Sequence, residues 1–304
     1  MSTAAPAPRW AAVVVNYESG DLLAECVASL RADDSAGAPE IVVVDNGSTD
    51  GSVATLHAHD PHVTVIDPHD NLGYARAANL GIAATRAPIV AVINPDTVLE
   101  PGSAAAVLGA FARDEAVAVV GPRILNPDGT TYPSARTDPG PGTAAGHALL
   151  GRIRPENRYT RAYRQLDADP DVARDVDWVS GAALWFRRSA LDRVGGWDER
   201  FFMFLEDVDV CRSLTAAGGR VRYEPAARVV HVVGASRARR PVSMSLAHHR
   251  SAYAYARKWW SGPRRLALPA VAGALVVRGA VDATGAAVRS RAHRGRPESA
   301  GSTG

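Results

Sequence analysis

Short apolar runs alternate with longer amphipathic segments over residues 10–120 of the chain. Runs rich in Val and Ile are typical of strands buried in a parallel sheet, and they lie at residues 10–15, 41–44, 63–66, 89–93 and 117–120. Between them, apolar side chains recur every three or four residues, which predicts helices over residues 22–30, 53–59, 71–85 and 103–111. This alternation predicts an α/β fold, with a mostly parallel, Rossmann-like sheet flanked by helices.

Polar residues follow four of these strands. They are Asn16 and Tyr17, Asp45 and Asn46, Asn71 to Gly73, and Asn94 to Asp96. Right-handed crossovers bring the carboxyl ends of parallel strands to one edge of the sheet, where ligands of open α/β sheets bind. Taken alone, Asn94-Pro95-Asp96 is also a common turn sequence, so the predicted site depends on the four strand ends meeting.

The predicted site differs from a dinucleotide fold or a P-loop. Neither G-x-G-x-x-G nor G-x-x-x-x-G-K-[ST] occurs in the chain. The edge carries carboxylates, which repel phosphate. A phosphate ligand here would therefore need a divalent cation between the two negative groups.

The second half of the chain carries further candidate chemistry. Glu206 and Asp207 precede an amphipathic helix that is expected to end at Gly218, and the first helical turn stabilises an anion. An acidic pair there is also an ordinary N-cap. A strand is predicted over residues 182–186, and another apolar run ends at His231, where a packed histidine at a strand edge is the simple interpretation. The tryptophans of this half either fill the core or stack on a sugar, and they are Trp178, Trp185 and Trp197.

Composition indicates an ordinary globular protein. The 304 residues are 46% hydrophobic and 22% charged, which is enough for a sizeable core. Two cysteines, Cys26 and Cys211, lie in helical apolar patterns and form no disulfide framework, which favours a reducing cytoplasm. Residues 1–8 lack the pattern of a signal peptide, and no run of about 18 apolar residues predicts a membrane span.

Charge is distributed unevenly. Residues 1–234 contain 21 Lys and Arg against 30 Asp and Glu, whereas residues 235–304 contain 13 against 2. The basic residues of the tail lie near Trp259 and Trp260, and they include Arg237, Arg239, Arg240, Arg250, Arg257, Lys258, Arg264 and Arg265. The apolar residues 266–277 follow, and this combination favours an anchor on an anionic membrane surface. The alternative is a solvated helix packed on the body.

Nucleic acid is not expected as a partner. The basic tail alone would allow it, but the body carries no recognition motif and its acidic edge would repel phosphate.

Several segments in combination resemble the motifs of inverting family 2 glycosyltransferases. They are residues 13–17, 43–51, 71–75, 94–96 and 202–209. Further segments resemble the rhamnosyltransferase branch of the family, and they are residues 132–136, 162–165, 178–181 and 247–251. The resemblance covers about residues 10–260 and implies a GT-A fold. It implies a nucleotide-sugar-binding half (10–123) and an acceptor and catalytic half of the same domain (124–234). The residues outside these halves predict a flexible N-terminus (1–9), a helical, basic, membrane-associating extension (235–288) and a disordered tail (289–304).

The resemblance assigns the first half to the nucleotide-sugar donor. The residues implied in donor binding are Asn16, Tyr17, Asp45, Asn71, Gly73, Arg76, Asn79, Asn94 and Asp96. Tyr17 and Asp45 match contacts to the base and ribose, while Asn71 and either Arg76 or Asn79 are expected near the diphosphate and sugar.

A divalent cation, Mn²⁺ or Mg²⁺, is implied as well. Asp96 matches the second carboxylate of the family's D-x-D motif and is expected to bind the cation that bridges the donor's diphosphate. Asn94 replaces the first carboxylate, which leaves one anionic ligand fewer and predicts weaker or less selective metal binding. His231 is expected to complete the site, and an imidazole ligand favours manganese.

Inverting sugar transfer is a single displacement that needs a base for the acceptor hydroxyl. The resemblance implies Asp207 as this base and Glu206 as a group that positions the acceptor, while Asp209 is structural or pairs with Arg212. Further acceptor-side residues are implied, and they are Trp178, Ser180, Gly181, Trp197 and Asp198. His248 and His249 are expected to be packing or acceptor-groove residues.

The resemblance also implies the partners. The donor is expected to be dTDP-L-rhamnose, and the acceptor N-acetylglucosaminyl-diphospho-polyprenol, the lipid linker of cell-wall synthesis. The enzyme is expected in the cytoplasm, peripherally attached to the inner face of the cell membrane. A UDP-sugar donor, another polysaccharide or lipid acceptor, and a non-enzymatic nucleotide-sugar sensor stay open as alternatives, and so does the formation of a homo-oligomer.

Overall fold

The computed structural model describes residues 8–138, 140–151, 153–232 and 241–279. The chain divides into two compact units. The larger unit comprises Met1–Phe202 and Glu206–Ser236, and the C-terminal unit comprises Met203–Leu205 and Arg237–Gly304. Residues 1–7 of the expected flexible N-terminus and the expected tail over residues 289–304 lie outside the described residues, and so do Arg237, Arg239 and Arg240.

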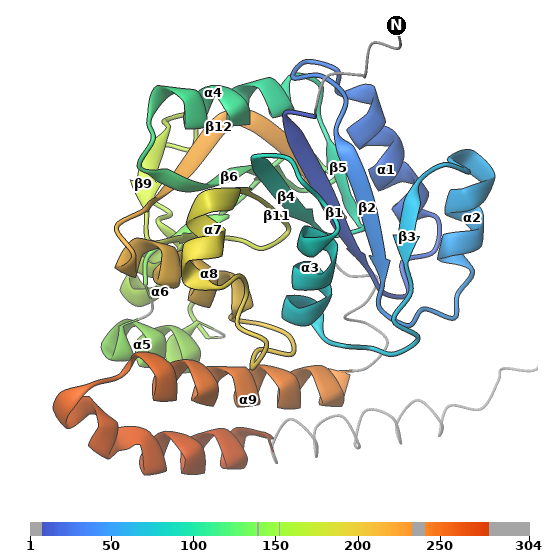
Figure 1. Ribbon diagram of the computed structural model, residues 1–304. Helices are drawn as coiled ribbons and strands as arrows, with labels where there is room; N and C mark the ends of the chain where they lie inside the picture. The colour runs from blue at the N-terminus through green and yellow to red at the C-terminus, as the bar shows by residue number, and fades with distance from the viewer. Residues whose placement is uncertain (1–7, 139, 152, 233–240, 280–304) are drawn as a thin grey trace, which may run out of the picture. The chain divides into compact units, whose positions relative to one another are not determined.

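The first half of the larger unit has the predicted alternation of strands and helices (Figure 1). Its elements are β1 (Trp10–Asn16), α1 (Leu22–Ala32), β2 (Glu40–Asp45), α2 (Ser52–His59), β3 (Thr64–Ile66), α3 (Tyr74–Ala83), β4 (Ile89–Ile93), β5 (Thr97–Leu99), α4 (Ser103–Arg113) and β6 (Val117–Leu125). The neighbouring strands β3, β2, β1 and β4 pair in parallel, in that order. Their carboxyl ends therefore meet at one edge, as predicted.

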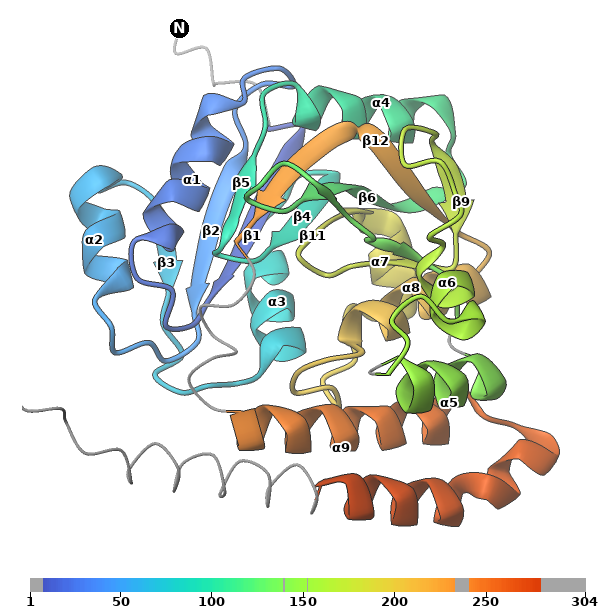
Figure 2. The same cartoon turned by 180° about the vertical axis from the view of Figure 1, so that it is seen from behind.

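Helices lie on both faces of these strands (Figure 2). Trp10, Val14 and Val43 belong to the main apolar cluster together with buried residues of α1, α2 and α4. On the opposite face, Gly81 of α3 lies against Val13 and Val44, so closely that a Cβ at this glycine would overlap the Val13 side chain. The period-two pattern of the strands thus places helices on both faces.

The second half continues the sheet in a different way. Its elements are β7 (Thr131–Tyr132), β8 (Ala135–Arg136), α5 (Pro141–Leu150), α6 (Arg158–Arg164), β9 (Arg174–Val176), β10 (Trp178–Val179), β11 (Ala183–Arg187), α7 (Arg188–Val194), α8 (Glu206–Ala216) and β12 (Arg220–His231). Strand β11 inserts between β4 and β6 and is antiparallel to both, while β12 is parallel to β6. The ten-stranded sheet, with the central order β3-β2-β1-β4-β11-β6-β12-β5, is therefore parallel through β4 and mixed beyond it.

Two small strand pairs shape the site. Strand β5, which the apolar pattern does not predict, pairs antiparallel with the end of β12 and brings Thr97 opposite His231. Strands β8 and β10 form a separate two-stranded ribbon in which Arg136 is opposite Trp178. Both pairings join segments that are far apart in the sequence.

The C-terminal unit is helical. It contains α9 (Pro241–Trp259), the 3-10 helix η1 (Gly262–Ala267) and a helical segment over residues 268–279. Ser251 of α9 donates a hydrogen bond to the carbonyl of Met203 (2.8 Å), and the His248 ring packs against Phe204. None of the helices in the described residues is both long enough and apolar enough to cross a membrane.

Candidate active site

The ends of β1 and β2 are joined by a buried network around Asn16. Its side-chain amide donates to Asp45 (2.8 Å), Ser48 (3.1 Å) and Ser52 (2.9 Å). Asn16 is fully buried and Asp45 is nearly so, whereas Tyr17 is partly exposed. Asn16, Tyr17 and Asp45, which are predicted to bind the nucleotide sugar, therefore lie at the same edge of the sheet. The side chain of Asn16 fixes the orientation of the Asp45 carboxylate.

The Asn71 loop lies beside this network. Asn46 donates to the Asn71 side chain (3.1 Å), which also accepts a bond from the Gly73 N–H (3.0 Å). The sequence pattern predicts a helix that begins at Asn71. Because Gly73 has φ +81°, a non-helical value, the helix begins only at Tyr74. A Cβ on Gly73 would lie 2.7 Å from the carbonyl oxygen of Phe202, which confirms that a residue without a side chain is needed here.

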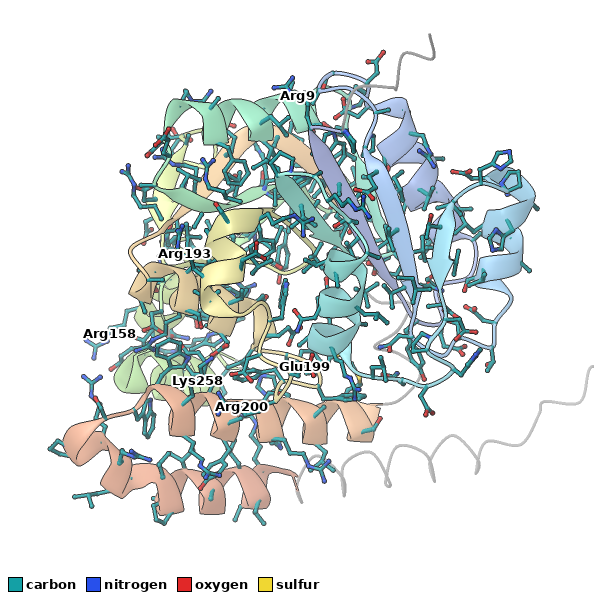
Figure 3. All side chains as sticks on the ribbon, viewed as in Figure 1. Arg9, Arg158, Arg193, Glu199, Arg200 and Lys258 are labelled. Carbon is teal, nitrogen blue, oxygen red and sulfur yellow. The ribbon has the colours of Figure 1, made fainter. Side chains whose placement is uncertain are left out.

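Helix α3 carries Arg76 and Asn79, which are also predicted to bind the nucleotide sugar. Arg76 is exposed and lies 3.9 Å from Glu199, in the loop after α7 (Figure 3). Asn79 hydrogen-bonds both main-chain groups of Trp197, at 2.9 Å each. Trp197 is 2% exposed and makes edge contacts with Tyr74 and Phe186. In this structure Asn79 and Trp197 therefore hold the loop after α7 against the sheet.

Asp96 and His231 lie side by side. Their Oδ1 and Nε2 atoms are 3.0 Å apart, and their side chains are only 12% and 14% exposed. The β5·β12 pairing fixes this geometry, and the Val232 N–H also donates to the Asp96 carbonyl (2.9 Å). A carboxylate oxygen and an imidazole nitrogen this close form a donor pair that suits a transition metal ion. Within the described ranges, no group of three or more His, Cys, Asp or Glu side chains is placed to hold a metal ion.

Cys26 lies behind this pair. Its thiol donates to the carbonyl of Asn94 at 3.6 Å. Burial, with the charge of Asp96 adding to it, raises the pKa of the Cys26 thiol to about 12. The thiol is therefore neutral and packs as an apolar group. Cys26 and Cys211 are both buried and free, as the sequence predicts.

Glu206 and Asp207 begin helix α8. The carboxylate of Asp207 accepts hydrogen bonds from the N–H groups of Gly181 (2.9 Å) and Val208 (2.8 Å). Burial raises the pKa of Asp207, while these two bonds and the charge of Arg136 oppose the rise. Asp207 is thus a poorly solvated carboxylate held in one orientation by main-chain donors.

Glu206 has fewer compensating contacts. One of its carboxyl oxygens is buried and finds no hydrogen-bond partner among the residues that the structure describes. Burial and then the neighbouring charge of Asp207 raise the pKa of Glu206 well above its usual range. A protonated Glu206 beside an ionised Asp207 gives one hydrogen-bond donor and one proton acceptor at the same place.

Tyr74 connects the two sides of the site. Its hydroxyl donates to the Gly181 carbonyl (3.2 Å). Burial, followed by the charges of Glu206, Asp207 and Asp96, raises the pKa of Tyr74 well above its usual range. The charge of Asp96, on the side predicted to bind the nucleotide sugar, and the charges of Glu206 and Asp207, on the acceptor side, therefore all affect the Tyr74 hydroxyl. The sequence pattern does not single out Tyr74, because an aromatic residue at the start of a helix is ordinary in a core.

The acceptor-side residues fall into two groups. Trp178, Ser180 and Gly181 lie at or just beyond β10, and the Gly181 N–H contacts Asp207 directly. Trp197 and Asp198 lie in the loop after α7, where Asp198 binds Arg200 at 2.9 Å (Figure 3). Asp209 is expected from the resemblance either to be structural or to pair with Arg212. Asp209 is buried, and the Arg212 guanidinium lies 2.8 Å from the carboxylate of Asp138.

Comparison with known proteins decides the class. Residues 11–195 match the model of "Glycosyl transferase family 2", and residues 157–280 match "Glycosyl transferase family group 2". The chain belongs to glycosyl transferase family 2. Enzymatic sugar transfer, expected from the motifs, is thereby confirmed for this glycosyltransferase.

Two relatives from Mycobacterium tuberculosis are similar to this glycosyltransferase. An N-acetylglucosaminyl-diphospho-decaprenol L-rhamnosyltransferase is 39% identical over 84% of this chain and 88% of its own length. A pre-mycofactocin glycosyltransferase is 33% identical over 63% of this chain and 37% of its own length. The first of these relatives supports the expected rhamnosyltransferase branch.

Two solved structures share the fold. A mannosyltransferase from Pyrobaculum calidifontis, in complex with GDP-Man and Mn²⁺, has a TM-score of 0.55 at 19% identity and covers 96% of this chain and 82% of its own. GalNAc-T7 with UDP, GalNAc and Mn²⁺ has a TM-score of 0.54 at 15% identity and covers 75% and 44%. The expected GT-A fold is confirmed. The roles of individual residues are not tested by these likenesses and stay predictions.

Proposed function

We propose that this glycosyltransferase moves L-rhamnose from dTDP-L-rhamnose to N-acetylglucosaminyl-diphospho-polyprenol with inversion at the anomeric carbon. The choice of sugar and acceptor follows the 39% identical relative. The structural observation that carries the mechanism is the way residues 181 and 182 join the two carboxylates: the Gly181 N–H binds Asp207 (2.9 Å), and the Ala182 carbonyl accepts a hydrogen bond from the N–H of Asn94 (2.8 Å), two residues before Asp96. One carboxylate is thereby available as a base and the other as a ligand of the donor side.

Asp207 is the proposed base. It removes the proton of the attacking acceptor hydroxyl while the new bond from that oxygen to the anomeric carbon forms and the bond to the donor's diphosphate breaks. The N–H groups of Gly181 and Val208 fix the orientation of Asp207 before the acceptor arrives. Glu206, protonated because of burial and the charge of Asp207, donates a hydrogen bond to the acceptor sugar.

Asp96 and His231 are the proposed metal ligands. Their donor atoms are close enough to share one ion in place of the hydrogen bond between them, and both side chains are largely protected from solvent. A bound Mn²⁺ or Mg²⁺ would offset the negative charge of the departing diphosphate. The imidazole favours Mn²⁺, the ion present in both solved neighbours. Tyr17 and Asp45 hold the nucleoside, and Asn71 and Arg76 lie toward its phosphates.

The C-terminal unit is proposed to lie on an anionic membrane surface. Apolar side chains project into solvent there, and Leu266, Val276 and Val277 are 84%, 73% and 65% exposed. Arg264 and Arg265 are exposed on the same unit. Exposed apolar groups beside cationic groups match the boundary between acyl chains and anionic headgroups. Such a location suits a polyprenyl acceptor.

A donor comparison on the purified full chain tests the proposed function. We expect transfer from dTDP-L-rhamnose to a short-chain N-acetylglucosaminyl-diphospho-prenol in the presence of Mn²⁺, and little transfer from UDP-glucose or UDP-galactose. The configuration of the new linkage, read by NMR, should be opposite to that of the donor. Preferential use of a UDP-sugar would favour the second candidate function, transfer from a UDP-sugar by a glycosyltransferase of the same family. The Asp207→Asn variant is the inactive control.

A further inference from the structure

Two arginines and a histidine converge in the larger unit, outside the roles assigned above. Arg136 comes from β8, Arg164 from the last turn of α6 and His147 from α5. Burial and then the charges of Arg164 and Arg136 lower the pKa of the His147 imidazole. The His147 ring also lies 4.9 Å from the ring of Tyr163, which is 5.5 Å from the Arg136 guanidinium and directly precedes Arg164 in α6, so three different elements bring these residues to Tyr163.

Arg136 is held in an aromatic enclosure. Its guanidinium lies 4.9 Å from the ring centre of Trp178, 5.5 Å from that of Tyr163 and 5.6 Å from that of Tyr132. It donates to the Tyr132 hydroxyl (2.7 Å) and to the Pro133 carbonyl (3.2 Å). An arginine has five N–H donors, so these contacts fix the plane of the group and leave donors for a ligand.

The cationic cluster lacks carboxylate partners. No Asp or Glu oxygen in the described part of the chain lies within ion-pair distance of Arg136 or Arg164, and the buried Nε of Arg164 finds no hydrogen-bond partner there. Other partly buried arginines of the larger unit either pair with a carboxylate, as Arg123 does with Asp171, or donate several bonds to main-chain carbonyls, as Arg187 does. Because partly buried cations without a carboxylate to offset their charge are costly, two of them together indicate a site for an anionic ligand.

The cluster is connected to the proposed base through the β8·β10 ribbon. Arg136 is opposite Trp178 in this ribbon, and Gly181, just beyond its end, donates to Asp207. The charge of Asp207 also acts on Arg136 and raises its pKa, against the opposing effect of burial. An acceptor hydroxyl bound at Asp207 would thus lie near these cationic groups. In a lipid-linked sugar the diphosphate is attached to the sugar ring, only a few bonds from the ring hydroxyls.

We propose that Arg136 and Arg164 bind the diphosphate of the lipid-linked acceptor. The enzyme then recognises its acceptor as a sugar diphosphate and not as a sugar alone. Guanidinium groups form paired, charge-assisted hydrogen bonds with phosphate oxygens, and the rings around Arg136 hold one guanidinium ready for this geometry. The inference rests on the proposed function, because it takes the acceptor to be a sugar linked to a lipid through a diphosphate.

Binding measured without donor tests this inference separately from the transfer reaction. The probes are geranyl-diphospho-N-acetylglucosamine and the uncharged octyl glycoside of N-acetylglucosamine, titrated into the full chain by calorimetry. We expect the unmodified protein to prefer the diphosphate by tenfold or more. Arg136→Gln and Arg164→Gln should each reduce that preference about tenfold or more and leave binding of the octyl glycoside unchanged.

Arg158→Gln is the matched control. Arg158 is an exposed residue of the same helix as Arg164, and it packs over the ring of its neighbour Tyr159 (Figure 3). This change should leave both affinities unchanged. Thermal melting shows whether each variant is folded, and Arg136→Lys, which keeps the charge but not the planar group, should bind the diphosphate with intermediate affinity.

The unmodified protein provides a second readout through His147. A bound diphosphate offsets the charges of Arg136 and Arg164, so the pKa of His147, followed by NMR, should rise when the diphosphate probe is added and not when the octyl glycoside is added. The inference is overturned by equal affinities for the two probes, or by full preference in Arg136→Gln and Arg164→Gln. A wrong assignment of the donor sugar would change neither result.

Discussion

The main-chain N–H of Gly181 donates a 2.9 Å hydrogen bond to the carboxylate of Asp207. This bond joins the end of β10 to the first turn of α8, and the two residues are 26 positions apart in the sequence. A Cβ on Gly181 would lie 3.1 Å from the Cβ of Asp207, so the approach leaves little space for a side chain. The position of the proposed base is therefore set by the strand connection as well as by its own helix.

Asp207→Asn should remove the base and keep most of the geometry, since the amide oxygen can still accept the Gly181 bond while the bond from Val208 is lost. We expect kcat to fall by about 10²- to 10⁴-fold, the usual contribution of a general base. The affinity for the donor nucleotide should change less than about twofold, because Asp207 does not contact it in the proposed mechanism. Steady-state kinetics and nucleotide titration measure both. Glu115→Gln, an exposed residue between α4 and β6, is the control, and full turnover in Asp207→Asn would exclude Asp207 as the base.

Glu206→Gln should make the protein more stable at neutral pH. The pKa of Glu206 is raised in the folded state, so below the unfolded pKa the carboxyl is protonated in both states and has no penalty. As the pH rises from the unfolded pKa to the folded pKa, the unfolded chain releases this proton while the folded protein retains it, so the free energy of unfolding falls. Thermal melts should show a Tm gain of about 2–4 °C at pH 8, the shift that about 1 kcal/mol gives in a domain of this size, and almost no gain near pH 4. A gain that grows toward low pH would contradict the assignment.

Asp96→Asn should abolish the metal dependence of nucleotide binding. The unmodified protein should bind dTDP about tenfold or more tightly with Mn²⁺ than with EDTA, and the variant should show no such difference. His231→Asn should weaken the response to Mn²⁺ more than the response to Mg²⁺, because an amide oxygen replaces the imidazole. His59→Asn, an exposed histidine of α2, is the control for general effects. If chelation leaves the affinity of the unmodified protein unchanged, neither residue has the proposed role.

Gly73→Ala and Gly102→Ala form a matched pair. Both glycines have positive φ, +81° and +87°, so alanine is strained at either position. Gly102 has open space around its Cα, whereas a Cβ at Gly73 would press on Phe202. We expect Gly102→Ala to lower the free energy of unfolding by about 1 kcal/mol and Gly73→Ala by clearly more. Denaturant unfolding measures the difference. Equal losses would show that the contact with Phe202 adds nothing.

The membrane surface can be tested without truncating the chain. Leu266→Ser, Val276→Ser and Val277→Ser combined should reduce binding to anionic vesicles by tenfold or more, since each apolar side chain contributes about 1.5 kcal/mol or more when buried. Activity on a long-chain acceptor in vesicles should fall more than activity on a short-chain acceptor in solution. Val172→Ser alters an exposed apolar residue of the larger unit and should have no effect. Unchanged vesicle binding in the triple variant would rule out this surface.

The sequence by itself determined the elements of the first half and the class of enzyme. Apolar periodicity depends only on which side of a strand or helix is buried, so it located β1 to β4 and their helices to within a few residues. Parallel pairing then brought Asn16 and Asp45 to one edge. Asp207 at a helix start could be predicted for the same local reason.

Only the tertiary structure decided the pairings between distant segments. Asp96 and His231 are 135 positions apart, and they meet because β5 adds to the edge of β12. The insertion of β11 between β4 and β6, and the enclosure of Arg136 by rings from three segments, likewise have no local signal. Local patterns encode burial within one element. The choice of neighbours depends on the packing of the whole sheet, and that choice completed the site.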